Sequence, residues 1–373
     1  ISPNDDSVQK TISARNLWIR LLTARIETGE PYIIFIDTVN KAIPEWHKKE
    51  GLTVKTSNLC SEITLPTNDK RTAVCCLSSI NVEKYDEWNK DPQFIEDIML
   101  FLDNVLSDFI NNAPEDFKKA IYSAERERSV GLGVMGFHSF LQQKNLSMEG
   151  VLAKVWNTRI FTDLKEKVDA SSRKIALDRG PCLDAVKTGE MERFSNKMAI
   201  APTASISIIC GGTSPGIEPI AANSFTHKTL SGSFNVRNKY LEEVLDKYGK
   251  NDEEIWSSIT TNQGSVQHLN FLDEQEKSTF KTAFEIDQRW IIELAADRTK
   301  HICQSQSLNI FLPADISKKA LHMLHYTAWK KGVKSLYYCR SKSIQRAEVI
   351  NNKFTGSVDD NVYNNYEECL VCQ

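Results

Sequence analysis

Two short apolar segments near the end of the sequence flank a segment with helical spacing. The first reads SLNIFLP (Ser307–Pro313), the helical segment covers 315–331, and the second reads SLYYCR (Ser335–Arg340). A helix between two strands makes a crossover connection, which joins parallel strands. Parallel sheets require helices on their faces, so the sequence predicts an α/β fold.

Earlier segments fit the same class. The expected strands are Tyr32–Asp37, Ala73–Asn81 and Lys197–Pro202, and the expected helices are 7–28 (ending at Gly29), a long helix opened by Asp91-Pro92, a helical stretch running to 180 and helices near 273–300. Apolar residues after Pro92 recur with the period of one helical face, which predicts an amphipathic helix there.

Composition excludes several classes of protein. The chain has 373 residues, 41% of them hydrophobic and 25% charged, which is ordinary for a globular protein of two or three domains. A formal net charge of -3 does not favour a nucleic-acid surface, and no apolar run predicts a membrane span. Nine cysteines with irregular spacing and no secretion signal indicate free thiols in a reducing, cytoplasmic compartment.

The segment NLCSE (Asn58–Glu62) combines a thiol with an amide and a carboxylate. In a β-like segment Asn58, Cys60 and Glu62 would point to one side. A thiol beside an acid and an amide is an unusual choice for a core and a reasonable choice for an active site. The neighbouring Glu62 would raise the pKa of the thiol and disfavour the thiolate. A hydrogen-atom transfer, which tolerates a neutral thiol, is therefore favoured over ordinary nucleophilic catalysis.

Four other motifs leave alternatives open. PTASIS (Pro202–Ser207) offers hydroxyl and backbone N–H donors to a phosphate, or is an ordinary polar loop. GLGVMG (Gly131–Gly136) lacks the strand and acidic residue of a dinucleotide site, so close backbone packing is preferred. His322 and His325 lack zincin spacing and are expected to be structural. Tyr337 and Tyr338 are adjacent in an apolar segment, where core packing is the simplest interpretation.

The end of the chain differs in composition. Residues 341–373 are polar and Asn-rich, which is typical of a mobile tail. This tail ends in EECLVCQ, so Cys369 and Cys372 form a CxxC pair. No second CxxC accompanies it, which disfavours zinc, whereas a vicinal pair on a tail suits thiol–disulfide exchange. A fortuitous pair is the alternative.

Taken in order, SNLCSEI, AVCCLSSIN, PTASIS…GIEP, SLYYCR and the terminal CLVC resemble the catalytic large subunit of class I (aerobic) ribonucleotide reductases. The resemblance runs from about Leu17 to the C-terminus. It implies the second half of a ten-stranded α/β barrel with a radical-cysteine finger loop, followed by a small α/β region and a flexible C-terminal tail. The activity it implies is reduction of ribonucleotides to 2′-deoxyribonucleotides.

The resemblance also implies roles for individual residues. Cys60 matches the thiyl-radical cysteine, and Asn58 and Glu62 match residues that position the sugar hydroxyls and move a proton. Cys75 matches one of two cysteines that reduce the 2′ carbon, Tyr337 and Tyr338 match the tyrosine relay, and Cys369 and Cys372 match the tail dithiol. The implied substrate-binding residues are Asn58, Leu59, Cys60, Ser61, Glu62, Pro202, Thr203, Ala204, Ser205, Ile206, Ser207 and Ile208.

The domain division follows from the same resemblance. We expect 1–48 to end the first half-barrel, 49–70 to form the finger loop, 71–225 to form the second half-barrel with the phosphate loop, 226–340 to form a C-terminal α/β region with the tyrosine pair, and 341–373 to form a mobile redox tail. The family's N-terminal half is not in this sequence, so we expect a split or cut large subunit that works with its N-terminal complement.

The resemblance implies no metal or cofactor bound directly by this chain. A metal-containing small subunit would supply the radical, and thioredoxin or glutaredoxin would supply electrons. The expected partners are the N-terminal half, the small subunit, the ribonucleotide and a second large-subunit unit in a dimer. Two alternatives remain: a glycyl-radical-type barrel enzyme, for which Gly356 in FTGSVDD is a poor match, and a non-catalytic interaction or metal-binding protein that uses its tail thiols.

Overall fold

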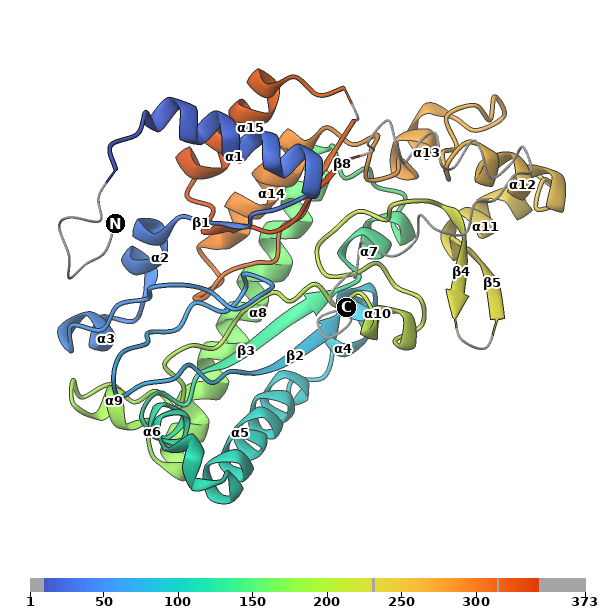
Figure 1. Ribbon diagram of the computed structural model, residues 1–373. Helices are drawn as coiled ribbons and strands as arrows, with labels where there is room; N and C mark the ends of the chain where they lie inside the picture. The colour runs from blue at the N-terminus through green and yellow to red at the C-terminus, as the bar shows by residue number, and fades with distance from the viewer. Residues whose placement is uncertain (1–9, 230–231, 314, 342–373) are drawn as a thin grey trace.

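The computed structural model describes residues 10–229, 232–313 and 315–341. Its central pair of strands is parallel: β2 (Cys76–Asn81) pairs with β3 (Val130–Met135) in continuous register from Cys76–Val130 to Asn81–Met135. Figure 1 shows this pair at the centre of the molecule, with α5 (Phe94–Asn112) below it and α8 (Val151–Arg179) behind it. The predicted α/β class is confirmed.

The parallel array continues beyond β3 through isolated bridges. Leu132 of β3 bridges Met198, and Ile200 bridges Gln306, both in parallel. The chain that passes Gln306 continues into β6 (Ile310–Leu312), which pairs in parallel with β8 (Cys339–Ser341). Five segments therefore lie side by side in one parallel succession, as expected for half of a ten-stranded barrel.

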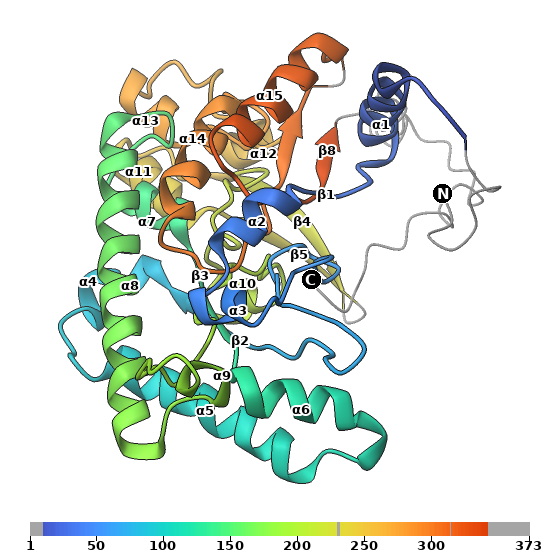
Figure 2. The same ribbon diagram turned by 90° about the vertical axis from the view of Figure 1, so that its left-hand side faces the viewer.

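Helices make the crossovers between these segments. The helix α15 (Lys318–Lys330) joins β6 to β8, which confirms the crossover unit predicted from the sequence. Figure 2 shows α8 along one flank of the molecule and α1 (Ala14–Thr28) on the other. The remaining elements are β1 (Ile33–Ile34), α2 (Ile36–Ala42), α3 (Glu45–Lys49), η1 (Val82–Lys84), α4 (Tyr85–Trp88), η2 (Glu115–Phe117), α6 (Lys118–Glu127), α7 (Phe137–Gln143), α9 (Leu183–Val186), α10 (Ile206–Ile209), β4 (Ser224–Thr229), β5 (Gly232–Arg237), α11 (Lys239–Lys247), α12 (Glu253–Thr261), α13 (Glu274–Thr279), α14 (Gln288–Thr299) and β7 (Ser335–Leu336).

Several predicted boundaries were wrong. The first helix begins at Ala14, where the Ser13 hydroxyl caps it, and ends at Gly29 as predicted; residues 7–9 lie outside the described part of the chain. The segment 32–37 is a two-residue strand followed by α2, and the strand predicted from Ala73 begins only at Cys76. The expected strand at 197–202 is reduced to the two bridges, and the helical stretch to 180 is divided into α7 and α8.

The main hydrophobic core lies between the parallel array and the long helices. In α5 the fully buried Ile95, Met99, Leu102 and Leu106 recur every three or four residues, which is the apolar face that the sequence predicts. A separate, smaller cluster lies in the 240–280 region and includes Trp256 and Leu241. In Figure 1 this region, with α11, α12 and α13, lies beside the β4–β5 hairpin.

A buried carboxylate joins α5 to the turn before β3. Asp103 is fully buried, and its oxygens accept hydrogen bonds from Arg128 at 2.7 Å, Arg193 at 2.8 Å and Arg179 at 3.0 Å. Three guanidinium groups therefore share this one carboxylate as their counter-charge. This cluster links α5, α8 and the segment that leads into β3.

Replacing this carboxylate tests how far the core depends on it. We expect Asp103→Asn to lower the free energy of unfolding by about 3–5 kcal/mol, because it leaves buried guanidinium groups without their counter-charge. The control is Asp86→Asn, which removes an exposed partner of Lys144 and should change stability by about 1 kcal/mol or less. Urea unfolding of both variants measures the difference, and equal losses would contradict the structural role of Asp103.

Candidate functional site

The segment around Cys60 is a tight turn. The Asn58 backbone N–H donates to Ile63 O at 3.3 Å, the Asn58 side-chain oxygen accepts from the Ile63 N–H at 3.0 Å, and Ser61 has a φ of 66°. The β-like conformation predicted for residues 58–62 was therefore wrong. The turn buries Cys60 and Glu62 almost completely and leaves Leu59 half-exposed.

Neighbouring strands hold this turn through its backbone carbonyls. The Ser307 hydroxyl donates to Cys60 O at 2.6 Å and lies 3.0 Å from the Glu62 carboxylate. The Ser335 hydroxyl donates to Ser61 O at 3.0 Å, and the Ser305 N–H donates to Glu62 O at 2.8 Å. Three consecutive residues of the turn are thus hydrogen-bonded to neighbouring segments of the barrel, and these bonds fix the position of the thiol.

A cavity of about 310 Å³ opens beside the turn. Its lining residues are Asn58, Cys60, Glu62, Leu77, Ser78, Ser79, Ala201, Pro202, Thr203 and Ile206. The three side chains singled out in NLCSE therefore share one cavity, although a turn and not a strand brings them together. Burial raises the pKa of Glu62, and hydrogen bonds from Asn58 and Ser307 partly oppose that rise.

The loop 202–208 forms another wall of this cavity. Pro202, Thr203 and Ile206 line it, whereas Ala204 and Ser205 are exposed near its edge. The Thr203 hydroxyl accepts from the Gly216 N–H at 2.7 Å, which holds the loop against the segment GIEP. Ser207 and Ile208 belong to the short α10 helix, and Ser207 donates to Ala204 O at 3.1 Å.

The tyrosine pair contacts the buried thiol. The Tyr337 hydroxyl donates to the Cys60 sulfur at 3.5 Å, and the ring centroids of Tyr337 and Tyr338 are 4.5 Å apart. SLYYCR is not one strand: β7 ends at Leu336 and β8 begins at Cys339, with both tyrosines between them. Burial, and then the contact with Cys60, raise the pKa of Tyr337, so its phenol is neutral in the folded protein.

A third tyrosine joins this pair, and sequence reasoning missed it. The centroid of the Tyr32 ring lies 4.6 Å from that of Tyr337 and 4.9 Å from that of Tyr338. Tyr32 immediately precedes β1, which pairs antiparallel with β7 in the register Ile33–Leu336. The available signal was only the run YIIFID, because its partner strand could not be known from one sequence.

Cys75 lies close to the site but does not line the cavity. It packs against the cluster of Ile63, Leu65 and Ala199 that follows the turn. Its sulfur accepts a hydrogen bond from the Gln304 amide at 3.4 Å, and Gln304 also accepts from the Thr64 N–H at 3.2 Å. Burial raises the pKa of Cys75, so the thiol form is favoured in this structure.

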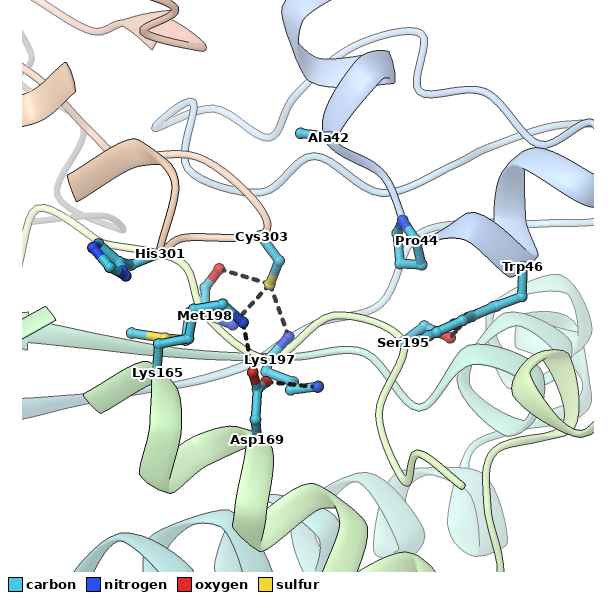
Figure 3. A pocket seen from close by; sticks show the side chains of 10 residues that line it. All are labelled: Ala42, Pro44, Trp46, Lys165, Asp169, Ser195, Lys197, Met198, His301 and Cys303. Atoms are coloured by element: carbon cyan, nitrogen blue, oxygen red, sulfur yellow. Dashed lines mark hydrogen bonds and ion pairs between the residues drawn. The ribbon is translucent and has the colours of Figure 1, made fainter. Parts of the chain in front are cut away.

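A second cavity, of about 140 Å³, has a different lining (Figure 3). Lys197 and Lys165 both pair with Asp169 there, at 2.8 and 2.6 Å. The Cys303 sulfur in this cavity accepts from the backbone N–H groups of Lys197 and Met198, at 3.1 and 3.2 Å. No residue of the predicted site lines it, so the chemistry predicted from the sequence does not belong to this cavity.

The glycine-rich motif GLGVMG and the two histidines of α15 have structural roles, as the sequence analysis preferred. A side chain at Gly131 or Gly133 would collide with Leu77 or Ala199, which confirms close backbone packing in GLGVMG. His322 accepts from the Trp18 indole at 3.0 Å, and His325 contacts Leu321 O at 2.8 Å.

The part of the chain that the structure describes has neither a cluster of metal-binding side chains nor a membrane-spanning helix. Across 10–229, 232–313 and 315–341, no group of three or more metal-binding side chains gathers. In the same part of the chain, no helix has both the length and the apolar character of a membrane span. Cys369 and Cys372 lie outside the described residues.

Comparison with known proteins identifies the family. The chain matches the ribonucleotide reductase barrel domain over residues 2–189 and 186–339, and it therefore belongs to that family. It is 44% identical over 376 residues to the ribonucleoside-diphosphate reductase large subunit of Invertebrate iridescent virus 3, covering 100% of this chain and 59% of that protein. It is 53% identical over 297 residues to the corresponding subunit of Invertebrate iridescent virus 6, covering 79% of this chain and 31% of that one.

A solved structure supports the fold. The Actinobacillus ureae class Id ribonucleotide reductase alpha subunit superposes with a TM-score of 0.83 at 40% sequence identity, covering 88% of this chain and 61% of that one. The chain thus spans about three fifths of this structure and of the first relative, and less of the second. The barrel fold expected from the sequence resemblance is confirmed, and the family match agrees with the family that the resemblance named.

A buried carboxyl near the tyrosines makes stability depend on pH. Burial raises the pKa of Glu218 to about 7, although the charge of Arg340 and hydrogen bonding with Asn309 oppose the rise. Its ordinary pKa is 4.5, so the folded protein holds the proton more tightly than the unfolded chain. The contribution of Glu218 to the free energy of unfolding is therefore complete below pH 4.5, and it is lost as the pH rises through about 7.

We therefore expect Glu218→Gln, which cannot ionise, to become more stable relative to the native protein as the pH rises from 4.5 to 7. The gain should reach about 3 kcal/mol, since one pKa unit corresponds to about 1.4 kcal/mol. Glu274→Gln, at a side chain 95% exposed, should show no such trend. Urea unfolding at several pH values measures the difference in free energy of unfolding between each variant and the native protein. A difference for Glu218→Gln that does not change with pH would contradict the effect of burial on this carboxyl.

Proposed function

We propose that this chain is the C-terminal catalytic part of a ribonucleoside-diphosphate reductase large subunit, which reduces ribonucleotides to 2′-deoxyribonucleotides through a thiyl radical at Cys60. The observation that carries the proposal is the contact between the Tyr337 hydroxyl and the Cys60 sulfur at the wall of the 310 Å³ cavity. A phenol in hydrogen-bond contact with a thiol places the two ends of a hydrogen-atom transfer side by side.

In the proposed reaction a radical reaches Tyr337 from Tyr338. The O–H bond of Tyr337 then forms as the S–H bond of Cys60 breaks, which leaves a thiyl radical facing the cavity. A thiol S–H bond and the C–H bond of a sugar alcohol are similar in strength, so the thiyl radical can remove the 3′ hydrogen of a ribose reversibly. Glu62, whose pKa is raised by burial, is placed to exchange a proton with the sugar hydroxyls beside Asn58.

The loop 204–208 is proposed to hold the diphosphate of the substrate. Within the described part of the chain, the amides of Ala204, Ser205 and Ile206 have no hydrogen-bond acceptor. Backbone N–H groups without acceptors at the start of a turn form a favourable site for an anion. Their position beside the cavity sets a sugar near Cys60 when the phosphates occupy the loop. Leu59 and Ser61 are proposed to shape the cavity through the turn that carries Cys60.

Electrons for the reduction are proposed to come from thiols. Cys75, with a partner cysteine in the N-terminal half of the large subunit, would be oxidised to a disulfide as the 2′ carbon is reduced. Cys369 and Cys372 would then reduce that disulfide by exchange, and thioredoxin or glutaredoxin would reduce the tail pair in turn. In this proposal the chain contributes one cysteine of the first pair and both of the second, and the site is divided between two halves of the large subunit.

The remaining partners follow from the same proposal. A metal-containing small subunit supplies the radical to Tyr338, and two large-subunit units form a dimer. The viral and bacterial relatives are named as large or alpha subunits, which supports a separate small subunit. Free thiols at Cys60 and Cys75 need a reducing compartment, for which the cytoplasm is proposed.

The proposal is tested by Cys60→Ser in the complete complex with the N-terminal half and the small subunit. Serine is nearly the same size, but its O–H bond is too strong to yield a hydrogen atom to a tyrosyl radical. We expect deoxynucleotide formation to fall to background while thermal unfolding changes little. Cys182→Ser is the matched control, because Cys182 is equally buried and lies outside the cavity. Product formation above background by Cys60→Ser would exclude the thiyl-radical role.

A further inference from the structure

The side chain of Gln304 contacts the sulfur of Cys75, and the reaction proposed above gives this contact no role. Gln304 is fully buried, and its amide N–H donates to the Cys75 sulfur at 3.4 Å. The same amide nitrogen donates to Val130 O at 3.1 Å, and the amide oxygen accepts from the Thr64 N–H at 3.2 Å. These two backbone partners fix which end of the amide is the nitrogen, so one of its N–H groups is directed at the sulfur.

The backbone of Gln304 is held as firmly as its side chain. Its N–H donates to Met198 O at 3.1 Å, and its carbonyl accepts from the Lys334 ammonium at 2.6 Å. The buried Lys334 also donates to the carbonyls of the two residues before Gln304, at 2.7 and 2.8 Å. The amide therefore cannot turn away from the sulfur without breaking several buried hydrogen bonds.

The groups around the Cys75 sulfur act on its charge in opposite directions. Burial raises the pKa of Cys75. The ionised forms of Cys76, Cys303 and Glu127 act in the same direction as burial. The hydrogen bond from Gln304 lowers the pKa of Cys75. Of these groups, Gln304 is the one that favours a thiolate at Cys75.

We propose that Gln304 is a positioning residue that makes Cys75 the leaving group when the tail dithiol reduces the active-site disulfide. The inference rests on the proposed function, because it needs Cys75 to form a disulfide with a cysteine of the N-terminal half. The rate of thiol–disulfide exchange depends on the stability of the leaving thiolate and on access to the attacked sulfur. The Gln304 N–H stabilises the leaving thiolate. Close packing hinders attack on Cys75 itself, since a side chain at Gly131 would lie 3.3 Å from its sulfur.

The proposed exchange balances in atoms and electrons. One tail cysteine, as its thiolate, attacks the sulfur of the partner cysteine, and a new S–S bond forms between them. The S–S bond to Cys75 breaks, and its electron pair stays on the Cys75 sulfur beside the Gln304 N–H until Cys75 takes a proton from water. The second tail thiol gives its proton to water and attacks the first tail sulfur. The partner cysteine then leaves as a thiolate and is protonated, so the disulfide now lies in the tail.

The test identifies the sulfur that the tail attacks, in the complete complex with the N-terminal half and the small subunit. Cys369→Ser and Cys372→Ser, made one at a time, leave a single tail thiol, so a mixed disulfide accumulates after one round of product formation. Acid quenching, alkylation of free thiols and mass spectrometry show which cysteine is joined to the tail. We expect the tail on the partner cysteine and an alkylated Cys75. A tail joined to Cys75 would overturn the inference and leave the reductase function intact.

Replacing Gln304 in the complex with both tail thiols measures what its hydrogen bond contributes. Gln304→Met has nearly the same size but no N–H, so reduction of the disulfide by the tail should slow about tenfold. The first round of product, which does not need the tail, should be unchanged. Gln306→Met is the matched control and should change neither step. Gln306 is buried in the same segment, and its amide donates to Ala295 O and to the Thr299 hydroxyl, both at 3.0 Å.

The outcomes separate this inference from the proposed function. An unchanged rate of disulfide reduction in Gln304→Met would overturn the role of Gln304, and so would a loss of the first round of product, which indicates a structural role only. A native complex that forms product while neither tail variant forms a mixed disulfide would overturn the tail exchange and this inference together. A native complex without product would overturn the proposed function and the inference with it. The result for the two tail variants holds even where Gln304→Met does not fold.

Discussion

The hydrogen bond from the Tyr337 hydroxyl to the Cys60 sulfur is the contact on which the site depends. The two residues are 277 positions apart, and 3.5 Å separates the phenol oxygen from the sulfur. Cys60 is held there because Ser307, Ser335 and Ser305 bind three consecutive carbonyls of its turn. Tyr337 is held there because its backbone N–H donates to Leu308 O and its carbonyl accepts from Arg25. Neighbouring segments of the barrel thus hold both ends of the contact in place.

The groups that hold the Cys60 turn in place are neutral. The turn is fixed by hydroxyl and amide donors, while the densest charge cluster, around Asp103, lies with α5 and α8. Burial keeps Tyr337 and Cys75 protonated and raises the pKa of Glu62. A one-electron reaction benefits from such surroundings, because a neutral phenol and a neutral thiol exchange a hydrogen atom without creating a buried charge.

The sequence predicts those features that rest on local patterns. The crossover from β6 through α15 to β8 follows from apolar runs around a helical period, and α5 follows from its repeating apolar face. Asn58, Cys60 and Glu62 line one cavity, as the sequence predicts, but a turn brings them together and not a β-like conformation. The sequence did carry a signal for a turn, because Asn and Ser are residue types that favour turns. In the structure Ser61 takes a positive φ.

Other features depend on contacts between distant segments, which no local pattern reveals. The strand predicted at 32–37 gives way to α2 because Val39 packs with Ile43 and Val54, and Asn40 bonds to the Val54 carbonyl. Tyr32 joins the tyrosines only through the pairing of β1 with β7, which cannot be read from one sequence. The family resemblance assigned roles to individual residues, whereas the cavity shows which of them meet: Asn58, Cys60, Glu62 and the start of the loop 202–208.

The most direct test of the account is removal of the one oxygen atom that touches Cys60. Tyr337→Phe keeps the ring and its contacts, so thermal unfolding and substrate binding should change little, since one buried hydroxyl contributes about 1 kcal/mol. Deoxynucleotide formation by the complete complex should nevertheless fall to background, because phenylalanine cannot pass a hydrogen atom to or from the thiol. Tyr326→Phe, on the exposed face of α15, should retain full turnover. Near-native turnover by Tyr337→Phe would contradict the account and leave Tyr337 as a packing residue.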